Sequence, residues 1–313
     1  MKKGFKYKVN IDKLRLCYNM PANLYEYLKE HYTRHDSLNN TRILEEDNFN
    51  LVFIDEDENK MTAILNVKDI DGYFKLGTFS FSNSAKYEGK AFFTFENSAL
   101  YRIYAKTHTG EPTNCICHIQ YVADYYGMDF NNITELEIAF DSTFNYITKI
   151  RKMIKDIDAY DLYLNGKKVK DDETLDGYGE YYTRNRIKLL KSPTLYCSQA
   201  KKTDMKMRIY DKKRELNKKS PHKCELLKEW LGWDSINKLY RIEVVLHNTN
   251  VREFTERCGS KLLEEWGAHD NILNLLGIPN FLLAMFLDSA DRLIYFRNKK
   301  TREQISIVDV AGI

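Results

Sequence analysis

Alternation of apolar and polar residues runs through the first third of the chain and predicts β-structure. Segments 13–19, 72–83 and 90–97 carry apolar side chains at about every second position, which is the spacing of a strand with one buried face. Segment 50–67 has the same alternation on both sides of Asp55–Asn59, a polar stretch typical of a turn. This part of the chain is therefore expected to form strands joined by hairpins.

The rest of the chain mixes helical spacing with further strands. Helices are predicted at 21–32, 117–127, 146–158 and 220–233, and the pattern from Val251 onward is helical. Strands are predicted at 133–143, 186–191, 194–199, 205–212 and 238–248, with a polar loop at 165–185. This irregular order favours an α+β fold with a largely antiparallel central sheet, flanked by helices and followed by a C-terminal helical segment.

The pattern divides the chain into three consecutive regions. These are a strand-rich region at 1–100, a middle region at 101–250 and a helical region at 251–313. No internal repeat and no Pro/Gly-rich linker separates them, so one continuous globular unit is expected. The apolar positions of 261–287 suit core packing, a homodimer surface or a DNA-reading helix. Glu264 and Glu265 argue against phosphate contact, so core packing is expected first and a homodimer surface second.

Three of the predicted strands each have an apolar face and a charged face, because side chains alternate between the two sides of a strand. The apolar sets are Leu136, Ile138 and Phe140; Met205, Met207 and Ile209; and Tyr240, Ile242, Val244 and Leu246. The opposite sets are Glu137, Ala139 and Asp141; Lys206, Arg208 and Tyr210; and Arg241, Glu243, Val245 and His247. One tyrosine therefore shares a face with cations, and two other strands present carboxylates.

Positive charge is concentrated around that tyrosine. The whole chain carries only +3, but residues 182–223 hold fourteen cations and three anions, so the rest of the chain is acidic. Such segregation indicates a polyanionic partner such as nucleic acid. A solvated lysine-rich surface is the alternative interpretation of the same pattern.

If the three strands are neighbours in one sheet, Glu137, Asp141 and Glu243 converge near Tyr210. Carboxylates so close together repel unless a divalent cation lies between them, and oxygen ligands of this kind favour Mg²⁺ or Mn²⁺. A metal ion and cations would favour the phenolate form of Tyr210, which is otherwise a poor nucleophile, and would hold a phosphodiester against it. The alternative is that the three carboxylates are ordinary solvent-facing strand residues.

At these residues the chain resembles the replication-initiation-factor family, which includes rolling-circle plasmid initiators and related relaxases of conjugative elements. The matching stretches are "ITELEIAFDST" (133–143), "MRIYDKKRE" (207–215) and "YRIEVVLHN" (240–248), in that order, preceded by "GYFKLGTFSFSN" (72–83) and "KAFFTFENSALYR" (90–102). The resemblance covers about residues 60 to 255. Its specificity comes from the order and spacing of the stretches.

The resemblance implies a DNA nicking and strand-transfer enzyme that starts rolling-circle replication. It assigns the nucleophile to Tyr210, which would become linked to a 5′ phosphate, and the metal ligands to Glu137, Asp141 and Glu243. The cations expected to position DNA are Lys206, Arg208, Lys212, Lys213 and Arg241. The implied partners are origin DNA, with a hairpin or single-stranded nick site, and a host helicase. A mobilisation relaxase with the same chemistry, or a DNA-binding regulator without catalysis, remains an alternative.

Several residues compete for these roles or depart from the family pattern. Glu135 replaces a cation of the family pattern, and its role is left open. Tyr181 and Tyr182 are alternative nucleophiles, and His247 could assist proton transfer or be structural. His118, in a His-hydrophobic-Gln stretch, is expected to be an unremarkable helix residue. Cys115 and Cys117 are expected to be packing residues.

Targeting signals are not apparent. The longest apolar stretch, 281–287, is too short to span a bilayer, and the N-terminus has no apolar segment of the secretory type. The six cysteines form no CxxC pairs, so reduced thiols without a zinc site are expected. These features predict a cytoplasmic protein without membrane attachment.

Overall fold

A computed structural model of the chain divides it into two compact units. The structure describes residues 6–31, 33–34, 42–69, 72–102, 115–170, 174–177, 180–183, 194–198, 205–219, 221, 223–266, 272–277 and 279–311. Unit 1 comprises Met1–Asn10 and Glu137–Ile313, and unit 2 comprises Ile11–Leu136. The division therefore falls within two strands, β1 (Tyr7–Asn19) and β8 (Asp129–Ser142), which each contribute residues to both units.

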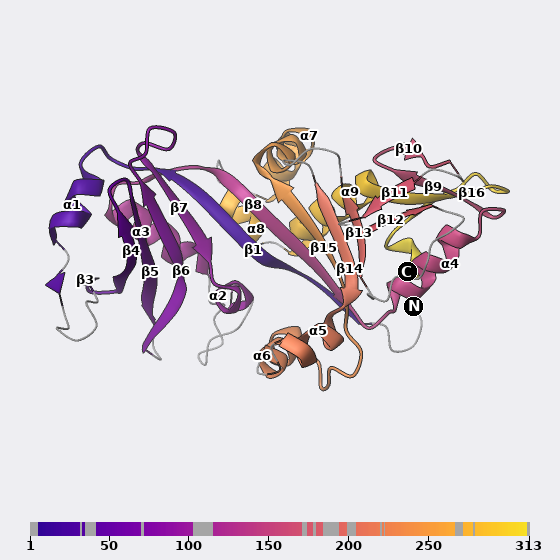
Figure 1. Cartoon of the computed structure of the whole chain (residues 1–313), viewed down its shortest axis with the longest axis horizontal. Coiled ribbons are helices and arrows are strands. Elements are labelled where there is room, and N and C mark those ends of the chain that lie inside the picture. Colours follow the sequence, from indigo (N-terminus) through magenta and orange to yellow (C-terminus); the bar gives the residue numbers. More distant parts are fainter. Residues whose placement is uncertain are drawn as a thin grey trace. The chain divides into compact units, whose positions relative to one another are not determined.

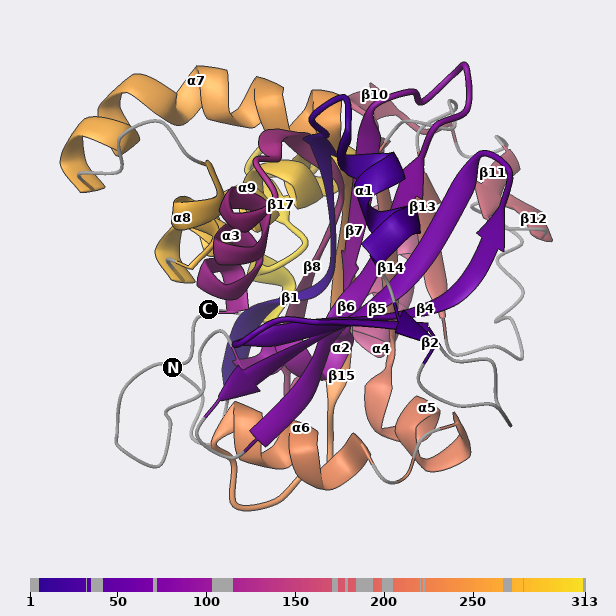
Figure 2. The ribbon, with the colours of Figure 1, turned by 90° about the vertical axis from the view of Figure 1, so that its left-hand side faces the viewer.

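Unit 2 is built on an antiparallel sheet. Its strand order is β1-β7-β6-β5-β4-β3-β2. Figure 1 shows β4, β5, β6 and β7 side by side, and Figure 2 shows them after a turn of 90°. The strands are β2 (Thr33–Arg34), β3 (Arg42–Glu45), β4 (Phe49–Asp57), β5 (Lys60–Asp69), β6 (Gly72–Ser82) and β7 (Lys90–Phe95). Its helices are α1 (Leu24–His31), α2 (Asn97–Arg102) and α3 (Cys115–Tyr125).

One face of this sheet forms the core of unit 2. Phe79, Phe81 and Phe93 have no exposed surface, and their rings stack or tilt against one another with centroids 4.7 to 5.0 Å apart. Helix α3 covers part of this face, because the rings of Tyr121 and Tyr125 pack edge-on against Phe49. The alternation seen in the sequence is thus the alternation between this face and the opposite one.

Unit 1 contains the other antiparallel strands of the described residues and most of their helices. Strands β13 (Leu195–Ser198), β14 (Lys206–Asp211), β15 (Tyr240–His247) and β8 lie in that order. A second sheet has the order β10-β9-β16-β17, with β9 (Tyr160–Leu164), β10 (Lys167–Lys168), β16 (Ile294–Asn298) and β17 (Gln304–Ser306). Strands β11 (Thr174–Gly177) and β12 (Glu180–Thr183) pair with each other.

The helices of unit 1 follow from capping and amphipathic spacing. They are α4 (Tyr146–Lys155), α5 (Lys212–Lys219), α6 (Lys223–Leu231), α7 (Asn248–Trp266), α8 (Ile272–Leu276) and α9 (Pro279–Leu293), with a short 3₁₀ turn at Asp309–Ala311. In α4 the N-cap Asn145 accepts a hydrogen bond from the Thr148 amide at 3.1 Å, and Ile147, Ile150 and Ile154 face the interior.

The predicted α+β class is confirmed, with a large antiparallel sheet flanked by helices and a helical C-terminal segment. Two local predictions are wrong. The stretch 165–185, predicted as a loop, contains β10, β11 and β12, and the helical C-terminal pattern ends in β16 and β17. The strand predicted at 186–191 lies outside the described residues. Within the described part of the chain, no helix has the length and apolarity needed to cross a membrane.

Candidate active site

The three strands with charged faces are neighbours in unit 1. Their order is β14-β15-β8, so the three strands are neighbours in one sheet, which is the condition for the predicted site. In the β14–β15 register, Arg208 is opposite Glu243 and Tyr210 is opposite Arg241. Residues paired in this way lie on the same face of a sheet, so these four side chains share one face. Strand β8 supplies Glu137 and Asp141 to the same cluster.

The Tyr210 hydroxyl lies between an acceptor and a cationic donor. It donates a short hydrogen bond to Glu243 Oε1, and Lys212 Nζ donates to the phenol oxygen at 3.2 Å. Tyr210 is 9% exposed and Glu243 is 2% exposed. A carboxylate that takes a proton and an ammonium group that stabilises the resulting oxyanion are the two groups that activate a phenol as a nucleophile.

Arg208 connects two carboxylates of the cluster. Its Nη2 atom lies 3.0 Å from Glu137 Oε2 and 2.7 Å from Glu243 Oε2. The side chain of Arg208 is 39% exposed, whereas that of Glu137 is 13% exposed. The guanidinium group therefore occupies the space between the two carboxylates and also has surface open to solvent.

Arg241 and Asp141 form a fully buried ion pair. Arg241 donates through Nε to Asp141 Oδ1 and through Nη2 to Oδ2, both at 2.7 Å, and neither side chain is exposed. Arg241 Nη1 also lies 3.5 Å from Glu243 Oε1. The prediction that Arg241 holds a DNA backbone is wrong, because a side chain without exposed surface cannot contact DNA in this structure.

Lys212 is itself held in place by helix α5. Its Nζ atom lies 2.9 Å from Glu215 Oε2, one turn along the helix, and Lys219 lies 3.6 Å from the other oxygen of Glu215. Burial opposes ionisation of Glu215, but the hydrogen bond and charge of Lys212, with the charges of Lys219 and Arg241, hold its pKa below the ordinary value. Glu215, for which the sequence indicated no role, therefore orients Lys212 toward Tyr210.

The donor set fits a divalent cation at two of the three predicted ligands. Glu137 and Glu243 both direct a carboxylate oxygen at one guanidinium nitrogen, so a cation already lies between them. Asp141 does not fit, because Arg241 engages both of its oxygens. Among the described residues, no group of three or more His, Cys, Asp or Glu side chains is placed to hold a metal ion.

The other predicted DNA-binding lysines lie close by in sequence and are half-buried. Lys206 begins β14 opposite Val245, and Lys213 Nζ lies 3.1 Å from Cys224 Sγ. The alternative nucleophiles Tyr181 and Tyr182 lie in β12. Six cations of the basic segment lie outside the described residues, namely Arg184, Arg186, Lys188, Lys191, Lys201 and Lys202.

The competing residues have ordinary surroundings where the structure describes them. Glu135 pairs with Lys13 at 3.0 Å, within unit 2. His118 lies in α3 with its ring edge-on to Phe74, as predicted for a helix residue. Cys115 is buried and donates to the Ala99 carbonyl, but Cys117 is exposed, so the packing role predicted for it is wrong. His247 is half-buried at the end of β15.

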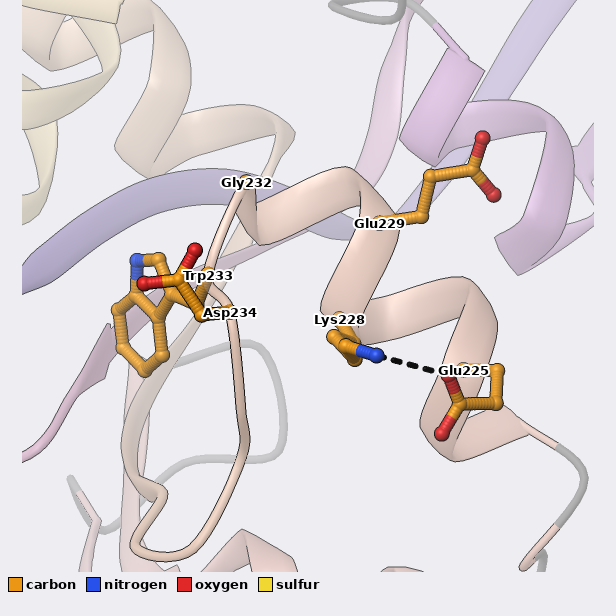
Figure 3. Close-up of a pocket in the computed structure, with 6 residues that line it drawn as sticks. All are labelled: Glu225, Lys228, Glu229, Gly232, Trp233 and Asp234. Carbon is orange, nitrogen blue, oxygen red and sulfur yellow. Dashed lines mark hydrogen bonds and ion pairs between the residues drawn. The ribbon is translucent and has the colours of Figure 1, made fainter.

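A separate hollow in unit 1 lies at the end of α6. Figure 3 shows the six residues that line it, including Glu225 paired with Lys228 at 3.3 Å. Its carboxylates at Glu225, Glu229 and Asp234 outnumber the one lysine, so it repels a phosphate backbone. None of the predicted site residues lines this hollow.

Comparison with known proteins assigns no family. No protein-family model matches the chain, and no curated protein matches it significantly.

Proposed function

We propose that the protein nicks one strand of DNA through a covalent 5′-phosphotyrosine intermediate and initiates rolling-circle replication. The observation that carries this proposal is the Tyr210 hydroxyl, hydrogen-bonded to buried Glu243 and contacted on the same oxygen by Lys212. The resemblance at 133–143, 207–215 and 240–248 supports the same chemistry, because it includes each strand of this cluster.

In the proposed step the phenol oxygen of Tyr210 attacks the phosphorus of a phosphodiester. The phenol proton passes to Glu243, and Lys212 stabilises the negative charge that develops on the oxygen. The bond from phosphorus to the 3′ oxygen breaks, and this oxygen takes a proton from solvent to leave a 3′ hydroxyl. The 5′ phosphate stays bonded to Tyr210. The new phosphotyrosine bond replaces the phosphodiester bond that was broken, so the strand can be rejoined by the reverse reaction.

Arg208 is the group best placed to hold the phosphate. Its partly exposed guanidinium matches the geometry of two phosphate oxygens, and DNA would compete with Glu137 and Glu243 for it. Glu137 Oε2 and Glu243 Oε2, the atoms that contact Arg208, would then hold Mg²⁺ or Mn²⁺, while Glu243 Oε1 accepts the phenol proton. A metal ion bound there supplies Lewis-acid stabilisation of charge on the phosphate.

We place the protein in the cytoplasm. All six cysteines are free thiols, which is expected of a reducing compartment. Its DNA partner would be an origin with a hairpin or single-stranded nick site. A mobilisation relaxase would use the same residues and differ only in the fate of the nicked strand.

The substitution Tyr210→Phe tests the proposal. Denaturing gels should show an adduct between the parent protein and a radiolabelled single-stranded oligonucleotide, with Mg²⁺ or Mn²⁺ present. The Phe variant should form no adduct and should still bind DNA. The control is Tyr295→Phe, a half-buried tyrosine of unit 1 in β16, which should form the adduct at the parent rate.

Two outcomes would overturn the proposal. If Tyr210→Phe forms the adduct as fast as the parent, another residue is the nucleophile. If the parent binds supercoiled origin DNA but neither nicks it nor forms an adduct, the protein is a DNA-binding regulator without catalysis.

A further inference from the structure

We propose that unit 2 holds a binding site for a nucleobase of single-stranded DNA, on the face of its sheet opposite the core. A hollow of about 910 Å³ lies there, within the size range of about 300–1,000 Å³ that is usual for small-ligand sites. It is lined by Arg15, Asp57, Glu58, Asn59, Lys60, Ser80, Ser82, Ser84, Tyr87, Phe92 and Thr134. All of these residues belong to unit 2, so the site does not depend on Tyr210 or its chemistry.

The strand register places the lining residues on one face. Ser80 pairs with Thr62 on one side and with Phe92 on the other, and Phe92 pairs in turn with Cys17. Arg15 pairs with Thr94, in the next row on the same face. The core phenylalanines occupy the alternate positions, so this face is the more polar one, and Arg15, Ser80 and Phe92 are half-exposed on it although Cys17 and Ser82 are buried.

Aromatic rings form one wall of the hollow. Tyr87 is 43% exposed, and its ring meets Phe92 edge-on with centroids 5.5 Å apart. Exposed aromatic side chains on a sheet are the platforms on which unpaired bases stack. Lys86 Nζ lies 5.0 Å from the centre of the Tyr87 ring, so a cation next to this ring could pair with the phosphate of a stacked base.

Arg15 contributes its guanidinium group to the lining of the hollow. Its guanidinium carbon lies 5.0 Å from the centre of the Phe92 ring, and its buried Nε has no hydrogen-bond partner among the described residues. Leaving a buried donor unsatisfied is costly, so such a group indicates an absent acceptor. Base carbonyl oxygens and ring nitrogens are acceptors of the right kind.

The remaining lining groups favour a base over a phosphate. The hydroxyls of Ser80, Ser82 and Ser84 can both donate and accept, as the edge of a base requires, and the last two lie 3.0 Å apart. Asp57 and Glu58 balance the charges of Arg15 and Lys60, so the hollow does not attract a polyphosphate as a purely cationic site would.

Photocrosslinking combined with binding measurements tests this site. Fluorescence anisotropy of a labelled dT20 oligonucleotide would measure the affinity of the parent, Tyr87→Ala and Arg15→Met. Tyr73→Ala is the matched control, because Tyr73 is equally exposed at 45%, lies in the same unit and does not line the hollow. Loss of one stacking contact should weaken binding about fivefold or more for Tyr87→Ala and leave Tyr73→Ala unchanged.

Mapping and competition give the decisive outcomes. An oligonucleotide containing 5-iododeoxyuridine should crosslink to the peptide that carries Tyr87, in the parent and equally in Tyr210→Phe. Equal affinities of parent, Tyr87→Ala and Arg15→Met would overturn the proposal, as would crosslinks confined to unit 1. Binding of free thymidine monophosphate without binding of dT20 would also overturn it, because the site would then serve a free nucleotide.

Discussion

The charged cluster of unit 1 and the polar face of unit 2 show two different uses of a β-sheet surface. In unit 1 the face formed by β14, β15 and β8 carries Arg241, Asp141 and Glu243, and all three are essentially without exposed surface. In unit 2 the face of β1, β7 and β6 carries Arg15, Phe92 and Ser80, and these three are half-exposed. The three residues of unit 1 are thus buried in the interior, whereas those of unit 2 keep exposed surface.

The difference explains how each surface treats its polar groups. A buried charge is costly unless it is paired, and in the cluster each charge has an opposite partner at hydrogen-bonding distance. Such mutual restraint holds Tyr210 in one geometry, which suits a reacting group. The polar face of unit 2 is less constrained, and Arg15 lines its hollow with an Nε atom that has no hydrogen-bond partner among the described residues.

The largest expected effect comes from removing a charge inside the cluster. Arg241→Met would leave Asp141 buried without its partner and should lower the free energy of unfolding by about 3–5 kcal/mol. Urea titration followed by tryptophan fluorescence would measure it, since Trp230, Trp233 and Trp266 all lie in unit 1.

The double substitution Arg241→Met with Asp141→Leu is the companion experiment. Removing both charges together leaves no unpaired ion in that pair, so the double variant should regain most of the stability that the single variant loses. A double variant less stable than Arg241→Met would contradict the importance of this pairing.

The next effect concerns rate. Lys212→Met removes the ammonium donor from the Tyr210 oxygen and should slow adduct formation about 10²-fold, which corresponds to about 2.7 kcal/mol in the barrier. Single-turnover gels would measure the rate. Lys218→Met, an exposed lysine of the same helix, is the control and should react like the parent. Equal rates for both variants would exclude a role for Lys212 in the reaction.

A smaller effect is expected in the sheet of unit 2. A Cβ atom at Gly77 would overlap the Thr94 carbonyl oxygen and the Phe93 ring, next to the irregular pairing between Leu65 and Asn66. Gly77→Ala should therefore cost about 2 kcal/mol of unfolding free energy, measured by urea titration with far-UV circular dichroism.

Gly166→Ala separates this crowding from backbone conformation. Gly166 has φ +73° but no atom within 4 Å of an added Cβ, so its substitution should cost only about 1 kcal/mol. If the two substitutions cost the same, the close approach at Gly77 does not restrict the sheet.

The smallest effect is a pH dependence in unit 1. Burial, with the nearby charges of Asp309 and Asp288, raises the pKa of Asp291 from its ordinary value of 3.8 to about 6. The folded protein thus keeps a proton that the unfolded chain has already lost, so stability should fall as pH rises from about 4 to 6. Asp291→Asn should remove this part of the slope and stabilise the protein at pH 7 by about 1 kcal/mol, after allowing for solvent screening.

Melting temperatures across pH 4 to 7 would measure this dependence. Asp234→Asn is the control, because the Asp234 side chain is fully exposed at 102% and should leave the slope unchanged. A slope that survives in Asp291→Asn would show that other groups cause it.

The elements that the sequence predicted well are those with one covered face. Strands β4, β5, β6 and β7 show the alternation because helices cover one side of their sheet and the other stays polar. Strands β16 and β17 were missed because they have five and three residues, and β16 follows α9 without a break. Their pairing with β9 and with each other depends on contacts distant in sequence, which a local pattern does not contain.

The candidate active site was also predicted only in part from the sequence. Alternation correctly placed Arg208 and Tyr210 on one face of β14, with Glu243 on the same face of β15. Alternation also placed Arg241 on this face correctly, but the predicted contact of Arg241 with DNA is wrong because β15 is buried on both sides. Which faces are covered depends on neighbouring elements, and the pairing of Arg241 with Asp141 follows from that burial.

The boundaries of unit 1 have a consequence for synthesis on the ribosome. Its N-terminal segment leaves the ribosome first, yet Tyr7 stacks on Phe140 and the Lys6 amide donates to Thr143, more than 130 positions later. Residues 11–136 can therefore fold before the residues that contact the first ten, such as Phe140 and Thr143, have emerged. Nascent chains halted after Leu136 has emerged, but before Glu137 to Ser142 of β8, should accordingly contain an ordered unit 2 and an unattached leading segment.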